Sequence, residues 1–435
     1  MDKLNLGENF IKDESIESYE YHEDTPTPGS SNLNQNNEIV IKINHQDLFL
    51  DISESYLHFE GRLLKKDNTS YVDADQVSLI NNALMYLFSN VKYKVSGQEI
   101  ENLNYPGETT TMMGYLKHSE DFEKTESLNQ LWYREQSLEQ ASTTKEKGFN
   151  LRHAYIIKKP KTKGTFSFSI PLKHIFGFCE TYNKVMYGFE HEISLYRKQD
   201  SRDSVIHEAD ISGEKVLRMT NTGKVRLDRL SWYVPHVKPS LEYETKLLTQ
   251  IRNKVKYEVA YKRFQDASTT INPGYTFDWR LTAKSSPEKP RFIIVGFQKR
   301  NGDGTFSDKS LFHHSFLKNI FVNLNSRRYP EVDYNVNFEE NKFSRVFLEA
   351  LRFKKNCFHS TDSVNISPFG FAEYYPLYVI DVSNQSDSIK GGVTDITIKM
   401  NFDKKVETNM EAYAVIVSDR IIMFEADGTK MRIVQ

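Results

Sequence analysis

Residues 224–239, KVRLDRLSWYVPHVKP, form the stretch that decides the fold. Its apolar residues recur with the period of two that a β-strand requires, but the pattern slips by one residue near Asp228 and Arg229. Such a slip predicts a bent strand with a β-bulge. Pro235 and Pro239 each remove a backbone N–H donor, so we expect sheet pairing to stop at these two residues.

The polar stretch 240–253 follows this strand and separates two long portions of the chain. The chain has 435 residues, which accommodates two domains of roughly 200 residues each. We therefore expect one β-domain over residues 38–238 and a second, built in the same way, over residues 239–435. The division is expected near residues 237–249.

The composition limits the classes of protein that the chain can represent. The 57 basic and 59 acidic residues give a formal net charge of −2, so no overall positive field favours nucleic acid or an anionic membrane. The 28 Phe and 24 Tyr favour strands and large packed interfaces. Only Cys179 and Cys357 occur, too few for a disulfide scaffold or a zinc cluster, which favours a reducing compartment.

The N-terminal region lacks the basic and apolar segments of a secretion signal, and no run approaches the roughly 20 apolar residues of a membrane span. We therefore expect a protein that is not secreted through a signal peptide and has no transmembrane segment. Residues 1–37 contain eight acidic residues and two lysines, and end in the polar stretch TPTPGSSNLNQNN. They are predicted to form an acidic arm that is disordered alone and acts in assembly.

Alternation predicts most of the remaining elements to be strands. In the first half these cover residues 39–43, 56–64, 91–95, 165–172 and 191–196, with a hairpin turn at 96–98. Residues 75–88 show apolar steps of three and four and predict a short amphipathic helix. The weakly patterned stretch 105–147, helix-like over 121–140, is predicted to be a surface excursion.

The second half repeats the strand pattern. Its elements are predicted at residues 255–264, 275–282, 291–297, 320–324, 345–353, 374–382, 393–402, 412–417 and 421–425, most of them strands, followed by a paired C-terminal tail. Asn301–Gly304 is predicted to be a turn. The two halves share a strand carrying Pro-Leu, at 171–172 and 376–377, then an alternating strand and a final apolar strand. Residues 201–222 are an extra segment of the first half.

Four longer strings carry a resemblance to a known family: FSIPLKHIFGFCETYNKVMYGFEHEISLYR (168–197), VRLDRLSWYVPHVKP (225–239), KNIFVNLNSRRYPEVDYNVNF (318–338) and AYAVIVSDRIIMFEADGTKM (412–431). They resemble the double jelly-roll major capsid proteins of the Polinton/Maverick (polintovirus, adintovirus-like, virophage-related) type. The resemblance implies an all-β fold of two tandem eight-stranded antiparallel jelly rolls with short helices in the connections. It also implies trimers that tile an icosahedral shell, and it carries over no catalytic residue.

Several combinations of residues could suggest a chemical site. His313 and His314 could ligate a metal but lack further ligands nearby in sequence, and Asn301–Gly304 has only part of a calcium loop. Cys179 follows His174, but the neighbouring Phe176 and Phe178 indicate a packed thiol. We therefore predict no metal, cofactor or catalytic site from these positions.

Two further clusters receive the same interpretation. Residues 359–363, HSTDS, contain the residue types of a catalytic triad in a polar loop, without evidence of their spatial roles. Arg327, Arg328 and Tyr329, and the pair Lys354 and Lys355, could touch nucleic acid, but such pairs are more often solvated or interface residues. We expect no sequence-specific binding of nucleic acid.

Two classes of function remain. A structural capsid protein, not an enzyme, accounts for the two β-units, the aromatic surplus and the near-neutral charge. A receptor- or carbohydrate-binding β-sandwich protein accounts for only the first two, and a catalytic cupin-like barrel would need a histidine and carboxylate cluster. The expected partners are further copies in a homotrimer, neighbouring capsomers and a penton or minor capsid protein, in a virion assembled in the host cytoplasm or nucleus. The aromatic-rich loops 105–116 and 368–378 are predicted lateral contacts.

Overall fold

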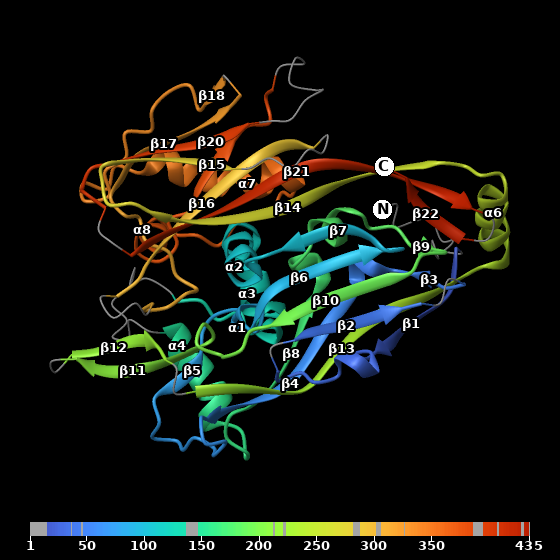
Figure 1. Cartoon of the computed structure of the whole chain (residues 1–435), viewed down its shortest axis with the longest axis horizontal. Coiled ribbons are helices and arrows are strands. Elements are labelled where there is room, and N and C mark those ends of the chain that lie inside the picture. Colours follow the sequence, from blue (N-terminus) through green and yellow to red (C-terminus); the bar gives the residue numbers. More distant parts are fainter. Residues whose placement is uncertain are drawn as a thin grey trace, which may run out of the picture.

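The computed structural model of the chain describes residues 15–35, 37–44, 47–135, 147–211, 214–220, 223–281, 288–301, 306–325, 327–385, 395–406, 409–427 and 430–434. These residues form two β-sandwiches that lie side by side, the first in the lower half of Figure 1 and the second in the upper half. The helix α6 (Leu241–Arg252) connects them at one end of the molecule.

The first sandwich is an eight-stranded jelly roll. Its strands in chain order are β1 (Ile16–Asp24), β2 (Glu38–Ile43), β4 (Tyr56–Lys65), β6 (Phe88–Val95), β7 (Gln98–Leu103), β8 (Thr165–Pro171), β10 (His191–Arg197) and β13 (Gly223–Pro239). One sheet has the order β1-β13-β4-β8 and the other has the order β2-β10-β6-β7. All of these pairs are antiparallel.

The second sandwich repeats this topology strand for strand. Its strands are β14 (Tyr257–Ile271), β15 (Thr276–Leu281), β16 (Lys289–Lys299), β17 (Leu317–Leu324), β18 (Arg327–Tyr329), β19 (Tyr378–Asp381), β20 (Ile396–Phe402) and β21 (Met410–Asp427). Its sheets have the orders β14-β21-β16-β19 and β15-β20-β17-β18. In both sandwiches the first, eighth, third and sixth strands form one sheet, and the second, seventh, fourth and fifth form the other, which is the arrangement of a double jelly roll.

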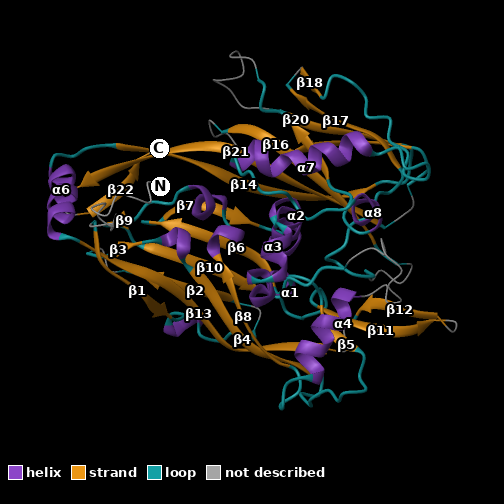
Figure 2. Ribbon diagram, turned by 180° about the vertical axis from the view of Figure 1, so that it is seen from behind, coloured by secondary structure: helices purple, strands orange, loops and turns teal. Residues whose placement is uncertain are grey.

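The duplicated topology confirms the repeat that the sequence predicted. The predicted alternating strands are the seventh strands β10 and β20. The two Pro-Leu pairs are not equivalent, because Pro171 ends the sixth strand β8, whereas Pro376 and Leu377 precede the sixth strand β19. The extra segment 201–222 of the first half contains the hairpin β11 (Val205–Ile211) and β12 (Glu214–Met219). In Figures 1 and 2 this hairpin projects at the end of the molecule opposite α6.

Short elements complete the described part of the chain. The remaining strands are β3 (Phe49–Leu50), β5 (Val77–Leu79), β9 (Met186–Tyr187) and β22 (Lys430–Val434). The remaining helices are α1 (Ala83–Tyr86), α2 (Pro106–Lys117), α3 (Glu120–Lys124), α4 (Lys147–His153), α5 (Gly177–Thr181), α7 (Ser344–Phe358) and α8 (Pro368–Glu373), with shorter turns η1 (Pro28–Ser30), η2 (Ile52–Glu54), η3 (Glu126–Gln130), η4 (Ala154–Lys158) and η5 (Leu172–His174).

The strand β13 contains the predicted bulge but not the predicted stop. Its register against β4 shifts between Leu227 and Arg229, so the slip in the apolar pattern does mark a β-bulge. Pairing nevertheless continues to the end of the strand, where Pro235 lies opposite Tyr21 and Pro239 opposite Ile16. The prediction that the prolines end the sheet was wrong because a proline loses its donor but keeps an acceptor, and the Pro235 carbonyl accepts the N–H of Asp51 at 3.1 Å.

The acidic arm predicted over residues 1–37 is corrected in part. Residues 16–24 form β1, the first strand of the first jelly roll, and pair with the C-terminal half of β13. Residues 1–14 lie outside the described residues. The charge of the segment concealed the alternation of Tyr19 and Tyr21 with polar neighbours, and the partner strand lies about 200 positions away in sequence.

Two predictions for the first half were wrong. Residues 75–88 contain the strand β5 and the single-turn helix α1, and all residues from Val77 to Phe88 are buried, so the steps of three and four reflect complete burial and not an amphipathic helix. The prediction of a surface excursion over 105–147 was wrong for α2, which is buried at every one of its residues, whereas α3 has no buried residue and residues 136–146 lie outside the described residues. The helix-like 121–140 contains only α3 and η3, and its residues 136–140 lie outside the described residues.

In the second half the predicted elements are present with two changes. Residues 345–353 belong to the helix α7, and the two predicted elements at 412–417 and 421–425 are one continuous strand, β21. The paired C-terminal tail is confirmed, since β22 pairs with β21. The boundary between the domains stays a prediction near residue 238, and the structure has α6 between β13 and β14.

Candidate functional site

The junction between the two jelly rolls is built around α2, which follows the fifth strand of the first roll. Pro106 occupies its first turn and Lys117 its last, as helix geometry and the helix dipole favour. The helix contacts the second roll through Tyr115. The hydroxyl of Tyr115 donates to the carbonyl of Ser310 at 2.9 Å, and its ring stacks on the ring of Tyr375 at 4.6 Å. Figure 2 shows α2 between the two sandwiches. A helix that is buried on all sides fixes the two rolls as one unit.

A buried carboxylate crosses the junction beside α2. Glu101, inside β7, is fully buried and accepts the backbone N–H groups of Gly177 (3.1 Å), Phe178 (2.8 Å) and, from the second roll, Phe264 (2.8 Å). Burial raises the pKa of Glu101 to about 7, although these hydrogen bonds act in the opposite direction. The group therefore titrates near neutral pH at a contact between the rolls.

A second carboxylate, on the second roll, accepts hydrogen bonds from donors of the first roll. Asp266 of β14 accepts the backbone N–H groups of Asn104 (3.0 Å) and Tyr105 (2.6 Å) and the hydroxyl of Thr109 (3.2 Å), all from the first roll. Burial raises the pKa of Asp266 above its ordinary value. Each roll thus uses an acidic side chain to bind backbone donors of the other, which specifies one relative orientation.

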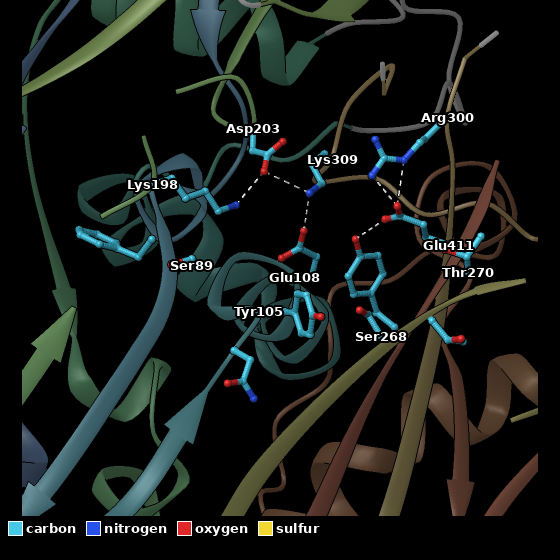
Figure 3. A pocket seen from close by; sticks show the side chains of 14 residues that line it. Ser89, Tyr105, Glu108, Lys198, Asp203, Ser268, Thr270, Arg300, Lys309 and Glu411 are labelled. Carbon is cyan, nitrogen blue, oxygen red and sulfur yellow. Dashed lines mark hydrogen bonds and ion pairs between the residues drawn. The ribbon is translucent and has the colours of Figure 1, made fainter. Parts of the chain in front are cut away.

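A polar cleft of about 470 Å³ lies along the same junction (Figure 3). Lys309 of the second roll lies 2.8 Å from Glu108 of α2 and 3.4 Å from Asp203, and Lys198 lies 2.7 Å from Asp203. On the other wall Arg300 donates to Glu411 at 2.9 Å. The three cations and three carboxylates of this cleft pair with one another, so the lining balances its own charge.

A second cavity of about 560 Å³ lies at the other end of α2, between α3, α5 and α7. Its walls include Lys117, which lies 2.7 Å from Glu180, and the histidines His118 and His174. Burial lowers the pKa of His174 to about 3 and that of His118 well below its ordinary value, so both rings are neutral. The two neutral histidines pack edge to face at 5.2 Å in the wall of this cavity.

The two cysteines are buried thiols. Cys179 lies among Phe176 and Phe178, which are fully buried with it, and burial raises the pKa of its thiol well above the ordinary value. Cys357 of α7 lines the second cavity, and burial raises the pKa of its thiol to about 12. Neither thiol has the lowered pKa that a nucleophile requires.

The adjacent histidines His313 and His314 stack on each other and on an aromatic ring. His313 and His314 lie in a loop with their rings stacked at 4.8 Å, and the ring of His314 also stacks on Phe338 at 4.6 Å. Within the described ranges, no group of three His, Cys, Asp or Glu side chains is placed to hold a metal ion. In the turn 301–304, residues 302–304 lie outside the described residues.

The remaining candidate positions are distributed over loops and faces. The hydroxyl of Ser360 lies 3.5 Å from Asp362 at an exposed position, in the wall of the second cavity beside His359. Arg327 lies over the ring of Tyr329 at 5.3 Å, and Arg328 forms an ion pair with Asp333. No described helix is long and apolar enough to cross a membrane.

The segment 105–116, predicted to be a lateral contact between subunits, is the buried helix α2 and so connects the two rolls of one chain. The aromatic residues of 105–116 misled the prediction, because aromatic enrichment marks an interface without showing whether its other side belongs to the same chain. In the segment 368–378, Phe369 is 62% exposed, whereas Phe371, Tyr375 and Tyr378 are buried.

Comparisons with solved structures place this architecture among known folds. The capsid of PBCV-1 is similar with a TM-score of 0.57 at 9% identity, covering 99% of each chain. The Faustovirus major capsid protein has a TM-score of 0.57 at 10% identity, covering 97% of this chain and 92% of the other. The Sputnik virophage structure has a TM-score of 0.56 at 10% identity, covering 99% and 91%.

At these identities the similarity concerns the fold. A search of curated protein sequences finds no match to the chain. A family model described as "Double jelly roll-like domain" matches residues 77–422, from β5 to β21. Because that match spans most of the chain and the strand orders are those of two jelly rolls, this protein belongs to the double jelly roll-like domain family.

Proposed function

We propose that this protein is a viral major capsid protein of the Polinton/Maverick type, a structural protein and not an enzyme. The observation that carries the proposal is the junction: a helix buried at all twelve residues, the buried carboxylate of Glu101 and the half-buried carboxylate of Asp266 join two jelly rolls of identical strand order. The likeness in fold to the PBCV-1 capsid and the Faustovirus major capsid protein supports it. The assignment to the Polinton/Maverick type is supported by the four strings of sequence described above.

The proposed working unit is a homotrimer. Three copies of a two-roll chain place six similar sandwiches around a threefold axis, which makes a nearly hexagonal tile while requiring only one cyclic interface. Such tiles cover the faces of an icosahedral shell, and a penton or minor capsid protein fills the remaining positions. In this scheme the protein resides in the virion and assembles in the host cytoplasm or nucleus.

The experiment that tests the proposal is a measurement of mass and shape. The purified chain is expected to be a trimer by light scattering at micromolar concentration, and hexagonal tiles or shells are expected by negative-stain electron microscopy. A well-folded, cooperatively unfolding monomer would contradict the proposal. Discrete monomers or dimers that bind glycans would favour a receptor- or carbohydrate-binding sandwich protein instead.

The N-terminal residues 1–14 are proposed to act in assembly between capsomers. Their four acidic residues and two lysines disfavour contact with phosphate groups. A chain lacking residues 1–14 is expected to form trimers but fewer shells, with the full chain purified in parallel as the control. Normal shell formation by the shortened chain would contradict this role.

A further inference from the structure

Inside one chain, the first roll covers a particular surface of the second. The helix α2 belongs to the insertion between the fifth and sixth strands of the first roll. It lies against β21, the eighth strand of the second roll, and against α7, and its Thr109 donates to Asp266 of β14, the first strand, at 3.2 Å. Tyr105 meets Tyr413 of β21 edge to face at 5.7 Å, and Lys117 lies over the ring of Phe264 in β14 at 5.5 Å. The fifth strand β7 also lies beside β14.

The topological equivalent of α2 in the second roll is α7, which lies in the insertion between the fifth and sixth strands β18 and β19. Whereas all twelve residues of α2 are buried, only Val346, Ala350, Phe353 and Cys357 are buried among the fifteen of α7. The opposite side of α7 is open and follows helical spacing. Its residues are Arg345, Leu348, Arg352 and Lys355.

The topological equivalents of β14 and β21 in the first roll are β1 and β13. No residue of β1 is buried, and Tyr19 and Tyr21 are 41% and 48% exposed. On the outer surface of the sheet Tyr21 lies 5.5 Å from Tyr56, which stacks on Tyr233 of β13 at 5.2 Å. We call the surface formed by these four tyrosines the tyrosine face. Clustered exposed tyrosines are typical of protein interfaces.

The open side of α7 and the tyrosine face have opposite charge. Of the acidic residues of β1, Glu23 has the same register as Tyr19 and Tyr21, whereas Glu20 and Asp24 have the opposite register. Glu23 and Glu60 lie on the tyrosine face, where both pair with the single cation Arg229. The open side of α7 contains the basic residues Arg345, Arg352 and Lys355. Arg327 and Arg328 of the adjacent β18 pair with Glu331 and Asp333 within the chain. Complementary charge favours docking of the two surfaces and fixes their register.

The open side of α7 lies on the second roll and the tyrosine face lies on the first roll. Each chain therefore has the two different surfaces that a ring of identical chains requires. A cyclic trimer has a heterologous interface, in which one surface of each chain binds a different surface of the next chain. A patch on the first roll and a complementary patch on the second roll satisfy this condition. A self-complementary patch would instead produce a twofold dimer.

We propose that α7 and β18 of one chain pack on the tyrosine face of the next chain, in the way that α2 and β7 pack on β14 and β21 within a chain. This contact rests on the proposed homotrimer and specifies its interface. It repeats the junction between rolls three times within chains and three times between chains, so that each of the six rolls has the same kind of neighbour.

Two charge-reversal variants test the contact. The first carries Arg352→Glu with Lys355→Glu on α7, and the second carries Glu23→Lys with Glu60→Lys on the tyrosine face. A matched control, Arg252→Glu, makes the same kind of change at an exposed position of the helix α6. Mass is measured by light scattering over a dilution series, and circular dichroism melting establishes that each variant is folded.

Each double variant is expected to weaken trimer association by about 100-fold, because like charges then face each other across the contact. A chain carrying all four reversals is expected to regain the trimer, since the attraction is restored with its sign exchanged. The Arg252→Glu control is expected to remain trimeric. The variant Tyr21→Ala, which leaves every charge in place, is expected to weaken the trimer as well.

Three results would overturn the contact: both reversed variants remain trimeric at wild-type affinity, the fourfold variant is no better than either double variant, or Tyr21→Ala has no effect. Glu23 also pairs with Arg229 inside the chain. If the variant with Glu23→Lys and Glu60→Lys misfolds for that reason, Tyr21→Ala and the α7 variant still test the contact, because they change exposed side chains only. A monomeric wild-type chain would reject the proposed trimer itself. If the wild-type chain is a trimer and every variant forms trimers equally well, only this contact is rejected.

Discussion

Glu101 of the first jelly roll accepts the backbone N–H of Phe264 in the second at 2.8 Å. The contact joins residues 163 positions apart in sequence, at a place where neither side chain is open to solvent. Because the same carboxylate also accepts two N–H groups at the start of α5, a single acidic side chain positions a strand edge and a helix terminus together. The junction between the rolls is thus specified by polar contacts inside an otherwise apolar core.

The first prediction concerns pH. The folded pKa of Glu101, about 7, lies above the ordinary carboxyl value of 4.5, because burial disfavours the ionised form. The unfolded chain therefore ionises first, so the contribution of this group to stability is present below pH 4.5 and is lost as the pH rises through about 7. Relative to the non-titrating variant Glu101→Gln, the wild-type free energy of unfolding should fall by about 3 kcal/mol over this range.

Chemical denaturation of both proteins at a series of pH values measures this difference. The matched control for the amide substitution is Glu258→Gln at an exposed position of β14. A flat difference for Glu101→Gln, or one that grows as the pH rises, would contradict the assignment.

The second prediction concerns the packing of α2. A Cβ atom on Gly114 would lie 2.3 Å from the ring of Trp132. Alanine favours a helix over glycine by about 1 kcal/mol, but overpacking a rigid core costs roughly 1–3 kcal/mol, so Gly114→Ala should lower the melting temperature by several degrees. Gly29→Ala, where nothing lies within 4 Å of the added atom, is the control and should leave the melting temperature nearly unchanged in calorimetry. A more stable Gly114→Ala protein would show that α2 can shift.

The third prediction separates β1 from the residues that precede it. Deleting residues 1–14 leaves every described pairing of β1 with β13 intact, and the melting temperature should stay near that of the full chain. Deleting residues 1–37 removes the first strand of the first roll and exposes the edge of β13, which should cause a large loss of stability and aggregation. Calorimetry and gel filtration of both truncations check this. Equal stability of the two would show that β1 is dispensable.

The fourth prediction concerns a buried ion pair. Arg152 is fully buried, lies 2.9 Å from Glu135 and donates to the carbonyl of Leu79 at 2.8 Å. Arg152→Met leaves the Glu135 carboxylate buried without its cation and should cost about 3–5 kcal/mol of stability. The control Lys246→Met, in an exposed pair with Glu242, should leave the midpoint of urea unfolding nearly unchanged, because solvent screens an exposed pair.

A double variant tests the cause of that loss. Adding Glu135→Gln to Arg152→Met removes the uncompensated charge, so the double variant should be more stable than Arg152→Met alone. If the double variant is no better, the loss arises from packing of the arginine side chain and not from charge.

Local pattern determined much of the fold by itself. The alternation in β13 and its slip at Asp228 predicted both the strand and the bulge, because each residue of a strand presents its side chain to one of two faces whatever the partner is. The recurrence of an alternating strand followed by a final apolar strand predicted the duplicated topology for the same reason, although the two Pro-Leu pairs lie at opposite ends of their strands. No comparable pattern marked the junction, whose polar residues occur singly along the chain.

Only the tertiary structure decided what covers each element. The sequence of α2 contains the glutamate, threonines and lysine of a surface segment, yet a partner roll about 160 residues away encloses it. The strand β1 has the acidic composition that is typical of a disordered segment, yet it is ordered because it pairs with the edge of β13. Solvent exposure depends on neighbours distant in sequence, and periodicity reports only which residues share a face. The Glu101 pKa and the open side of α7 follow from that long-range packing.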